Sequence, residues 1–157
     1  MEDFIIRPAL SEDIGHVQHL NLQAFQYEHD HGFDRRLNMH WPLSEAARAT
    51  VRSLIEQEDG ALLVAARGTA IVGYLAGHLS KAGPQHLSDH TALLQGLFVA
   101  EHVRRRGIGE QLVRRFLAWA SEKQVAGVSV AVAPANEPAV ALYRKLGFCD
   151  HTLVLAL

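Results

Sequence analysis

Apolar residues recur along this chain at two spacings, one typical of β-strands and one typical of amphipathic helices. Residues 4–8 form a short apolar run closed by a proline. This predicts a strand that stops there, because proline has no N–H to donate to a β-ladder. Helical spacing follows twice, first in a helix that Ser11 would cap and that runs to about Tyr27, and again from Ser44. Residues 28–42 between the two helices show neither spacing, so we expect an irregular surface segment there.

The rest of the chain alternates strand-like and helix-like segments. Strands are predicted at residues 61–66, 71–79, 91–99, 125–133 and 152–157, with a loop at residues 80–90. The run 125–133 is almost entirely apolar and β-branched, as in strands covered on both faces, and Gly96 predicts a bulge in its strand. One helix begins near Ile108, and another is capped by Asn136 and ended by Gly147. These elements predict a single α/β domain with a mixed sheet.

Composition narrows the function classes. The chain has 157 residues, enough for one domain, and 48% of them are hydrophobic and 20% charged. A formal net charge of −2 gives no sign of nucleic acid or of an anionic membrane as a partner, and no apolar run approaches the roughly 20 residues of a membrane helix. The start, Met1-Glu2-Asp3, is acidic where a signal peptide is basic, and the lone Cys149 excludes an internal disulfide. We therefore expect a cytoplasmic protein without a membrane segment.

A glycine-rich turn, residues 104–109, lies between the predicted strand 91–99 and the helix that follows it. Strand–turn–helix segments of this kind hold phosphate groups with exposed backbone N–H groups. A Walker-type phosphate loop is excluded, because Gly109 is followed by Glu110 rather than by Lys-Ser/Thr. A dinucleotide fingerprint is excluded as well, because its third glycine would fall at Leu112.

The turn Arg104-Arg105-Arg106-Gly107-Ile108-Gly109 matches the pattern Gln/Arg-x-x-Gly-x-Gly/Ala. With Leu97-Phe98-Val99 before it, the segment resembles the cofactor loop of the GNAT superfamily of N-acetyltransferases, which implies that it binds the pyrophosphate of acetyl-coenzyme A. Glycine at positions 107 and 109 lets a diphosphate approach the backbone, and the helix N-terminus attracts an anion. The alternative to a cofactor loop is a tight connection between the strand and the helix, with its arginines in solvent. The residues that the resemblance assigns to the cofactor are Leu97, Phe98, Val99, Arg104, Arg105, Arg106, Gly107, Ile108, Gly109 and Asn136.

A second block, from Asn136 to Phe148, resembles the family pattern Asn-x-x-Ala-x-x-Leu-Tyr-x-x-x-Gly-Phe. The resemblance implies that the Asn136 side chain contacts the pantetheine arm and that the Tyr143 hydroxyl, as the catalytic acid, protonates the departing thiolate. Each residue has a plainer alternative, Asn136 as a helix N-cap and Tyr143 as a core aromatic residue. Gly147 and Phe148 are sufficiently explained as a helix C-cap with its hydrophobic contact.

The residue that would take the proton of the acceptor amine is not evident. An alkylamine has a pKa of about 10.4 and must lose a proton before it attacks a thioester at neutral pH. Many members of the family carry a carboxylate on the strand before the glycine turn, where this chain has Gln95 and Gly96. His78, His90, Glu101 and a water chain are left as candidates, and each of the three side chains is equally well explained as an ordinary polar residue.

The irregular segment 28–42 is the predicted wall of the acceptor pocket, because in the family the connection between the first two helices often lines that pocket. The carboxylates that could attract a cationic amine are Glu28, Asp30 and Asp34, and the aromatic residues that could frame it are Phe25, Tyr27, Phe33 and Trp41. The histidines at positions 29, 31 and 40 match no established zinc spacing, so we predict no metal site.

The resemblance as a whole implies one acetyltransferase domain over residues 1–157, with a mixed, mostly antiparallel twisted sheet, about four flanking helices and splayed central strands. The predicted reaction moves an acetyl group directly from acetyl-coenzyme A to a primary amine of a small molecule or peptide. A non-catalytic acyl-coenzyme A-binding or regulatory module is the alternative that Gln95 leaves open. A nucleic-acid binder using Arg104–Arg106, Arg114 and Arg115 is disfavoured by the near-neutral net charge. Family members are often homodimers, and the predicted strand 152–157 could pair across such an interface.

Overall fold

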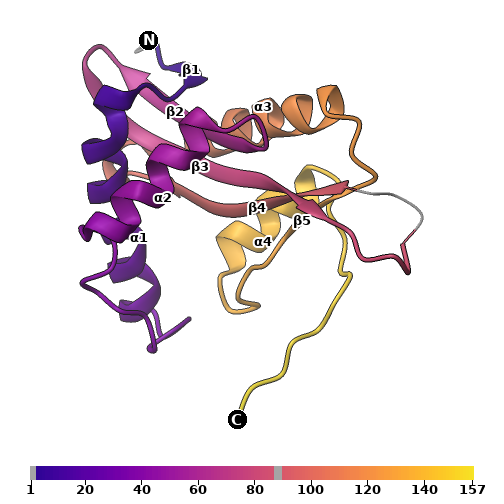
Figure 1. Ribbon diagram of the computed structural model, residues 1–157. Coiled ribbons are helices and arrows are strands. Elements are labelled where there is room, and N and C mark those ends of the chain that lie inside the picture. The colour runs from indigo at the N-terminus through magenta and orange to yellow at the C-terminus, as the bar shows by residue number, and fades with distance from the viewer. Residues whose placement is uncertain (1–2, 87–89) are drawn as a thin grey trace.

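Five strands form one sheet in the order β1-β2-β3-β4-β5 (Figure 1). The structure, a computed structural model, describes residues 3–86 and 90–157. The strands are β1 (Ile5–Pro8), β2 (Gly60–Arg67), β3 (Ala70–Lys81), β4 (His90–Val99) and β5 (Val128–Val130). Neighbours among the first four pair antiparallel, whereas β5 pairs parallel with β4. The predicted mixed, mostly antiparallel sheet is therefore confirmed.

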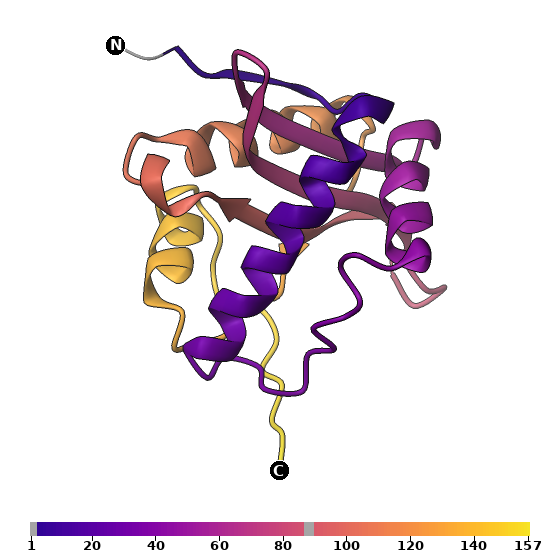
Figure 2. The same cartoon turned by 90° about the vertical axis from the view of Figure 1, so that its left-hand side faces the viewer.

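Helices cover both faces of this sheet (Figure 2). They are α1 (Ile14–Asp30), α2 (Glu45–Glu56), α3 (Ile108–Glu122) and α4 (Glu137–Lys145), with 3₁₀ turns η1 (Ser11–Asp13) and η2 (Glu101–Val103). The pair α1 and α2 lies over one face, and α3 and α4 lie over the other. Ser44 caps α2 as predicted, since its Oγ accepts a hydrogen bond of 3.0 Å from the Ala47 N–H. Within the described part of the chain, no helix has the length and apolar character needed to cross a membrane.

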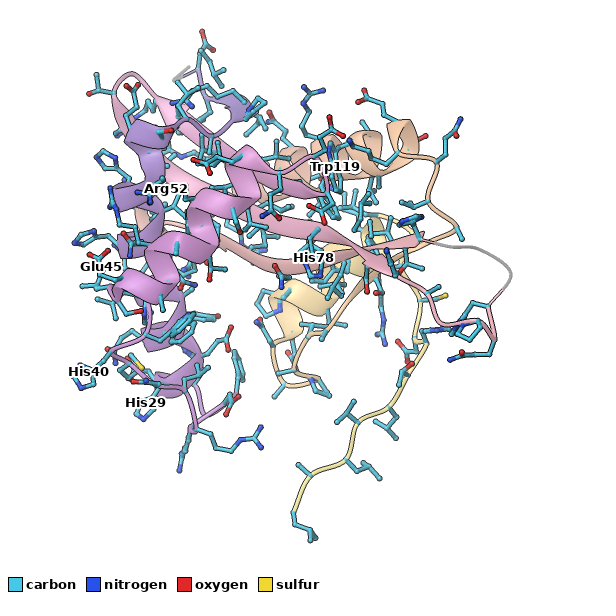
Figure 3. The ribbon with its side chains drawn as sticks, in the orientation of Figure 1. His29, His40, Glu45, Arg52, His78 and Trp119 are labelled. Atoms are coloured by element: carbon cyan, nitrogen blue, oxygen red, sulfur yellow. The ribbon has the colours of Figure 1, made fainter. Side chains whose placement is uncertain are left out.

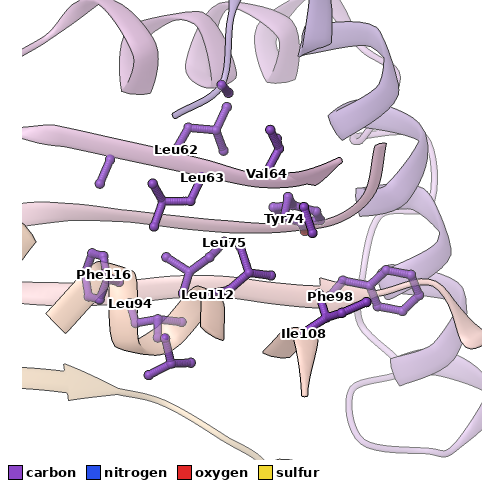
Figure 4. Packing of buried hydrophobic residues seen from close by; sticks show 14 of the residues in the cluster. Leu62, Leu63, Val64, Tyr74, Leu75, Leu94, Phe98, Ile108, Leu112 and Phe116 are labelled. Carbon is purple, nitrogen blue, oxygen red and sulfur yellow. The ribbon is translucent and has the colours of Figure 1, made fainter. Parts of the chain in front are cut away.

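The core fills the space between the sheet and α3 with fully buried aliphatic side chains and the Phe116 ring (Figure 4). Successive residues of a strand point to opposite faces, so β3 sends Tyr74 toward α1 and Gly77 toward α3. A Cβ at Gly77 would overlap the Phe116 ring. The glycine therefore permits the close approach of α3 to β3, which fixes where the N-terminus of α3 meets the end of β4.

A β-bulge interrupts β4 at Gln95. Ala76 of β3 pairs with Gly96, and Gly77 pairs with Leu94, so Gln95 is the extra residue between them. The irregularity that Gly96 predicted is thereby confirmed. Pairing of β4 with β5 ends at Leu94, although β4 continues to Val99. The last five residues of β4 therefore have no partner on the β5 side, which confirms the predicted splay of the central strands.

Two of the predicted strands were wrong. Residues 152–157 are not a strand but an extended tail that leaves the domain (Figure 1), with Leu153, Val154 and Leu155 at least 76% exposed. A strand requires a neighbouring strand for its hydrogen bonds, and among the described residues none pairs with this tail. The run 125–133 contains only the three residues of β5. Because β5 is an edge strand with a partner on one side only, it is half-exposed rather than covered on both faces.

The start of α1 also differs from the prediction. Ser11 lies in η1 and does not cap the helix, whereas Asp13 occupies the N-cap position. The Asp13 carboxylate accepts hydrogen bonds from the Leu10 N–H at 2.8 Å and from the Arg7 guanidinium at 2.7 Å. The start of α1 is thus stabilised by Arg7, a side chain of β1. The sequence pattern of α1 alone does not reveal this contact.

The predicted loop 80–90 is shorter in the structure. Ser80 and Lys81 end β3, and His90 begins β4. Residues 87–89 of that predicted loop lie outside the described residues.

Candidate active site

The glycine turn at the start of α3, called the cradle below, leaves open space outside its backbone. Gly107 is the N-cap residue and has φ +79°, a left-handed conformation that favours glycine. A Cβ there would have no neighbour closer than Gln111 Nε2 at 4.0 Å, so the space outside the turn is open. The N–H groups of the first helical turn have no intrahelical acceptor, and the helix dipole makes this end positive. The turn therefore fits a bound diphosphate.

Gly109 serves packing. A Cβ at this position would lie 3.4 Å from Leu142 Cδ2 of α4 and 3.9 Å from Val99 Cγ2 of β4. The small residue thus allows α3, α4 and the end of β4 to meet closely. This reason differs from the predicted one, which was access of the diphosphate to the backbone, and the assignment of Gly109 to the cofactor stays a prediction.

The three arginines of the turn have different surroundings. Arg104 Nε donates a hydrogen bond of 2.8 Å to the Val99 carbonyl, and its guanidinium carbon lies 5.0 Å from the ring centroid of Tyr27 and 5.2 Å from that of Phe98. These contacts hold the turn against β4 and the end of α1. Arg105 and Arg106 are exposed, and Arg105 has φ +65°. The guanidinium of Arg104 therefore braces the turn, while the other two extend from its surface.

The second sequence block forms α4 and the residues around its ends. Asn136 is the N-cap, with its Oδ1 accepting from the Ala139 N–H at 3.4 Å, which confirms the capping role; its contact with pantetheine stays a prediction. Lys145 of α4 binds Glu110 of α3 with an Nζ–Oε2 distance of 2.5 Å. Hydrogen bonds from Lys145 and Arg114 lower the pKa of Glu110. The block is thereby tied to the first turn of α3, beside the cradle.

Tyr143 combines a buried ring with an accessible hydroxyl. The residue is 7% exposed, and burial raises its pKa to about 12, so the hydroxyl stays protonated at neutral pH. Within the described residues, no buried side-chain oxygen or nitrogen lacks a hydrogen-bond partner. No described group hydrogen-bonds the Tyr143 hydroxyl, so this oxygen reaches the surface. A protonated, unshared and accessible hydroxyl can act as a proton donor.

A cavity of about 200 Å³ lies on the other side of the sheet, between α1, α2 and the β4 bulge. Gln95 and Gly96 of the bulge form part of its wall, and α2 contributes Ala47, Thr50, Val51 and Leu54. Phe25 of α1 and Trp41 of the connecting segment supply aromatic rings, as predicted for the acceptor pocket. The bulge therefore forms part of the cavity wall at the point where β4 ceases to pair with β5.

Two polar residues that sequence reasoning missed, Asn21 and Tyr74, lie in this cavity. Asn21 Nδ2 donates a hydrogen bond of 2.8 Å to Tyr74 Oη. Burial raises the pKa of Tyr74 to about 12, so its hydroxyl remains protonated. A Cβ at Gly96 would lie 3.6 Å from Tyr74 Oη, which places this hydroxyl directly beside the bulge. Neither residue belongs to a sequence motif, and no local signal could have found the pair.

The remaining aromatic residues of the predicted acceptor segment do not line the cavity. Tyr27 and Phe33 pack with His31, at centroid distances of 4.0 Å and 5.4 Å from the histidine ring. Because Arg104 lies over Tyr27, this aromatic cluster supports the cofactor turn. A role of Tyr27 and Phe33 in framing an acceptor stays a prediction.

Two of the predicted carboxylates of the segment, Asp30 and Asp34, have partners away from the cavity wall. Glu28, in contrast, adds to burial in raising the pKa of Tyr74 of that wall. Asp34 pairs with Arg36 at 3.2 Å, and Asp30 accepts a hydrogen bond of 2.8 Å from Gln26. Glu28 is half-buried, and burial together with Asp34 raises its pKa. Attraction of a cationic amine by these groups stays a prediction.

A buried glutamine that the sequence did not reveal anchors the connection between α1 and α2. Gln18 is 6% exposed, and its Nε2 donates to the carbonyls of Pro42 and Ser44 at 3.0 Å and 3.2 Å. Arg48 of α2 donates to its Oε1 at 3.3 Å. Gln18 therefore fixes the segment that carries Trp41 into the cavity.

None of the candidate bases lines the cavity. His78 lies on β3 opposite Leu93, and His90 and Glu101 are exposed. Figure 3 shows His29 and His40 near the far end of α1, well away from His78. Over residues 3–86 and 90–157, no group of three or more His, Cys, Asp or Glu side chains could hold a metal ion.

A known protein family and several solved structures share the sequence pattern or the fold of this chain. The profile of the acetyltransferase (GNAT) family matches residues 17–148. A mutant of the BH1408 protein from Bacillus halodurans is 24% identical with a TM-score of 0.84, covering 98% of each chain. The aminoglycoside N-acetyltransferase AAC(6')-Iy in complex with CoA is 19% identical with a TM-score of 0.76, covering 99% of this chain and 93% of that one. The aminoglycoside acetyltransferase HMB0005 from an uncultured soil metagenomic sample is 24% identical with a TM-score of 0.75, covering 99% and 97%. Because the family match spans most of its length, this chain belongs to the acetyltransferase (GNAT) family.

Proposed function

We propose that the protein is an acetyl-coenzyme A-dependent N-acetyltransferase, formed by one domain over residues 1–157, that acetylates a primary amine of a small molecule or peptide. The observation that carries this proposal is the position of the β4 bulge. Gln95 and Gly96 border the cavity of about 200 Å³ on one side of the sheet, and the unpaired end of β4 leads to the cradle at Gly107. A cofactor and an acceptor held in these two places meet at the bulge.

Acetyl-coenzyme A supplies the acetyl group as a thioester, whose C–S bond breaks as the new C–N bond to the amine forms. The backbone N–H of Val99, which lies on the unpaired side of β4, would polarise the thioester carbonyl. The Tyr143 hydroxyl would donate its proton to the sulfur that leaves, and the amine nitrogen would release its extra proton to solvent. Holding both reactants at the bulge supplies a further part of the rate enhancement.

The aminoglycoside acetyltransferases among the structural neighbours support an amine as the acceptor. The lone Cys149 supports a reducing, cytoplasmic location. Association into a homodimer stays a proposal drawn from the family.

A non-catalytic acyl-coenzyme A-binding module is the second candidate, and one observation favours it. Gln95 occupies the bulge where family members often have a carboxylate, and a glutamine cannot act as a base. Tyr143 opposes this candidate, because a protein that only binds the cofactor has no use for an accessible, protonated hydroxyl at this position.

The test is a thiol-release assay with acetyl-coenzyme A and a panel of primary amines, together with calorimetric titration of coenzyme A. We expect thiol release with at least one amine. Tyr143→Phe should lower kcat by about 100-fold or more while leaving the dissociation constant of coenzyme A unchanged. Tight binding of coenzyme A without thiol release from any amine would support the binding module instead.

A further inference from the structure

The cavity beside the β4 bulge is uncharged. Phe25, Trp41 and Leu54 are among the apolar side chains that form most of its wall. Its polar groups are neutral amides and hydroxyls, including those of Asn21 and Gln95. None of the described residues that line it is charged. A ligand that fills this space therefore gains mainly from apolar contact.

The size of the cavity limits what it admits. Its volume is about 200 Å³. Apolar cavities of about 150 Å³ hold a single benzene ring, and sites for larger ligands begin at about 300 Å³. One ring with a short arm, or a short alkyl chain, therefore fills the space, whereas several linked sugar rings would extend beyond it into solvent.

One carboxylate acts on the polar end of the cavity: Glu28 is half-buried on α1, one helical turn beyond Phe25, and its charge adds to burial in raising the pKa of Tyr74. Asp34 pairs with Arg36, and Asp30 accepts from Gln26, both outside the cavity wall. An ammonium group that leaves water needs a counter-charge or a full set of hydrogen bonds. A sugar with several ammonium groups would find neither for most of them.

Two of the polar groups of the cavity are joined by a hydrogen bond beside the bulge. Asn21 Nδ2 donates to Tyr74 Oη, which leaves Asn21 Oδ1 able to accept a hydrogen bond and the Tyr74 hydroxyl able to donate one. This pair lies beside Gly96. A single amine nitrogen can be satisfied there, next to the place where the thioester carbonyl is expected.

We propose, on the basis of the acetyltransferase function above, that the acceptor is a primary amine on a small apolar body. A single ring or short alkyl chain fills the space between Phe25, Trp41 and Leu54, and the nitrogen lies at the Asn21–Tyr74 end.

This acceptor class accounts for the missing carboxylate. The apolar wall disfavours the ammonium form, so the bound amine releases its proton on entry, to water or to the half-buried Glu28 carboxylate. The neutral nitrogen then forms the C–N bond as the C–S bond breaks, and the thiolate takes a proton from Tyr143. The proton that the new amide nitrogen loses passes to solvent, and solvent returns a proton to the Tyr143 oxygen. Gln95 at the bulge keeps the wall uncharged, as this route requires.

The test uses Trp119→Phe as the parent protein, which leaves Trp41 as the single tryptophan of the two in the chain. Trp119 stacks on Phe116 of the far side of the sheet, and phenylalanine keeps an aromatic ring there (Figure 3). Trp41 fluorescence is titrated with 2-phenylethylamine and with kanamycin, a sugar with several amino groups. Thiol release from acetyl-coenzyme A is measured with the same two amines.

A matched pair of variants localises the binding. Thr50→Phe places a ring at an exposed lining position of α2, and Ala49→Phe places the same ring at the exposed neighbouring position outside the cavity. We expect 2-phenylethylamine to have a kcat/KM at least about tenfold above that of kanamycin and to change Trp41 fluorescence. Thr50→Phe should weaken both signals by about tenfold or more, and Ala49→Phe should leave them unchanged.

Acetylation of kanamycin in preference to 2-phenylethylamine would overturn the proposed acceptor class and leave the acetyltransferase function intact. Equal effects of Thr50→Phe and Ala49→Phe would show that the apolar amine binds elsewhere, which also overturns it. Absence of thiol release with both these amines and with the wider panel would overturn the acetyltransferase function itself.

Discussion

The ring of Phe148 meets the ring of Tyr143 edge to face, with centroids 5.5 Å apart and planes inclined by 63°. The Phe148 N–H also donates a hydrogen bond of 3.0 Å to the Tyr143 carbonyl, and the Gly147 N–H donates to Arg144. These are the bonds of a Schellman motif, made possible by φ +97° at Gly147. Phe148, which follows the end of α4, thus holds the ring of Tyr143, the proposed proton donor, in place.

Phe148→Leu should therefore lower activity through Tyr143. Loss of the edge-to-face contact should reduce the free energy of unfolding by about 0.5 to 1.5 kcal/mol. Because the Tyr143 ring is then less constrained, kcat should fall while the KM of acetyl-coenzyme A changes little. Denaturant unfolding and steady-state kinetics measure the two effects. An unchanged kcat would show that Phe148 does not position Tyr143.

Gly107→Ala should damage the cradle. The left-handed backbone at Gly107 should cost an alanine about 1 to 2 kcal/mol of stability, or else the turn should change its conformation. Either result should weaken coenzyme A binding in a calorimetric titration. Gly127→Ala is the control, because a Cβ there meets nothing within 4 Å and its φ is not in the left-handed region. Equal coenzyme A affinity in the two variants would contradict the role of the cradle.

Removal of Arg104 should lower stability, whereas removal of Arg105 should weaken coenzyme A binding. Arg104→Gln removes the hydrogen bond to the Val99 carbonyl and the contacts with Tyr27 and Phe98, so we expect a loss of about 2 kcal/mol of stability. Arg105→Gln should leave the Tm unchanged and weaken coenzyme A binding, with less effect at high salt because an exposed charge is screened. Thermal melts and titrations at two salt concentrations distinguish the two. Identical changes in Tm and in coenzyme A affinity for the two variants would refute the different roles of Arg104 and Arg105.

Gln18→Leu should loosen the segment that carries Trp41. The substitution leaves the Pro42 and Ser44 carbonyls without their donor, which should cost about 1 to 3 kcal/mol. The Trp41 fluorescence of the Trp119→Phe protein should also shift toward that of an exposed tryptophan. Gln23→Leu, an exposed position of the same helix, is the control and should change neither quantity.

The Arg7–Asp13 pair should make stability fall in acid. The hydrogen bond from Arg7 lowers the pKa of Asp13 below its usual value of 3.8. Between the folded and the usual pKa the unfolded chain binds more protons, so stability rises with pH in that window. The contribution is therefore complete above about pH 3.8 and is lost as the pH falls through the folded pKa.

Asp13→Asn should remove this pH dependence. At neutral pH we expect it to lower the free energy of unfolding by about 1.5 to 3 kcal/mol, because the charged hydrogen bond is lost. Urea unfolding from pH 2 to 7 measures both effects, with Asp59→Asn as an exposed control. Parallel stability curves for Asp13→Asn and the unchanged protein would contradict the role of the pair.

The sequence determined those parts of the protein whose geometry depends on neighbours along the chain. Gly107 opens α3, Asn136 caps α4 and Gly147 ends it, and all three follow from local dihedral preferences and hydrogen bonds spanning a few residues. The bulge beside Gly96 follows in the same way. Together they identify the family and the cofactor half of the site.

Only the tertiary structure decided the acceptor half. The Asn21–Tyr74 bond joins residues 53 positions apart, and the Arg104 guanidinium finds Tyr27 across the fold. The cavity exists because α1 and α2 pack over the bulge, and β5 is short because β4 diverges from it beyond Leu94. Such contacts depend on which elements become neighbours in space, and no local pattern records that. Hydrophobic spacing could therefore predict strands at 125–133 and 152–157 but could not supply the partner strands that they would need.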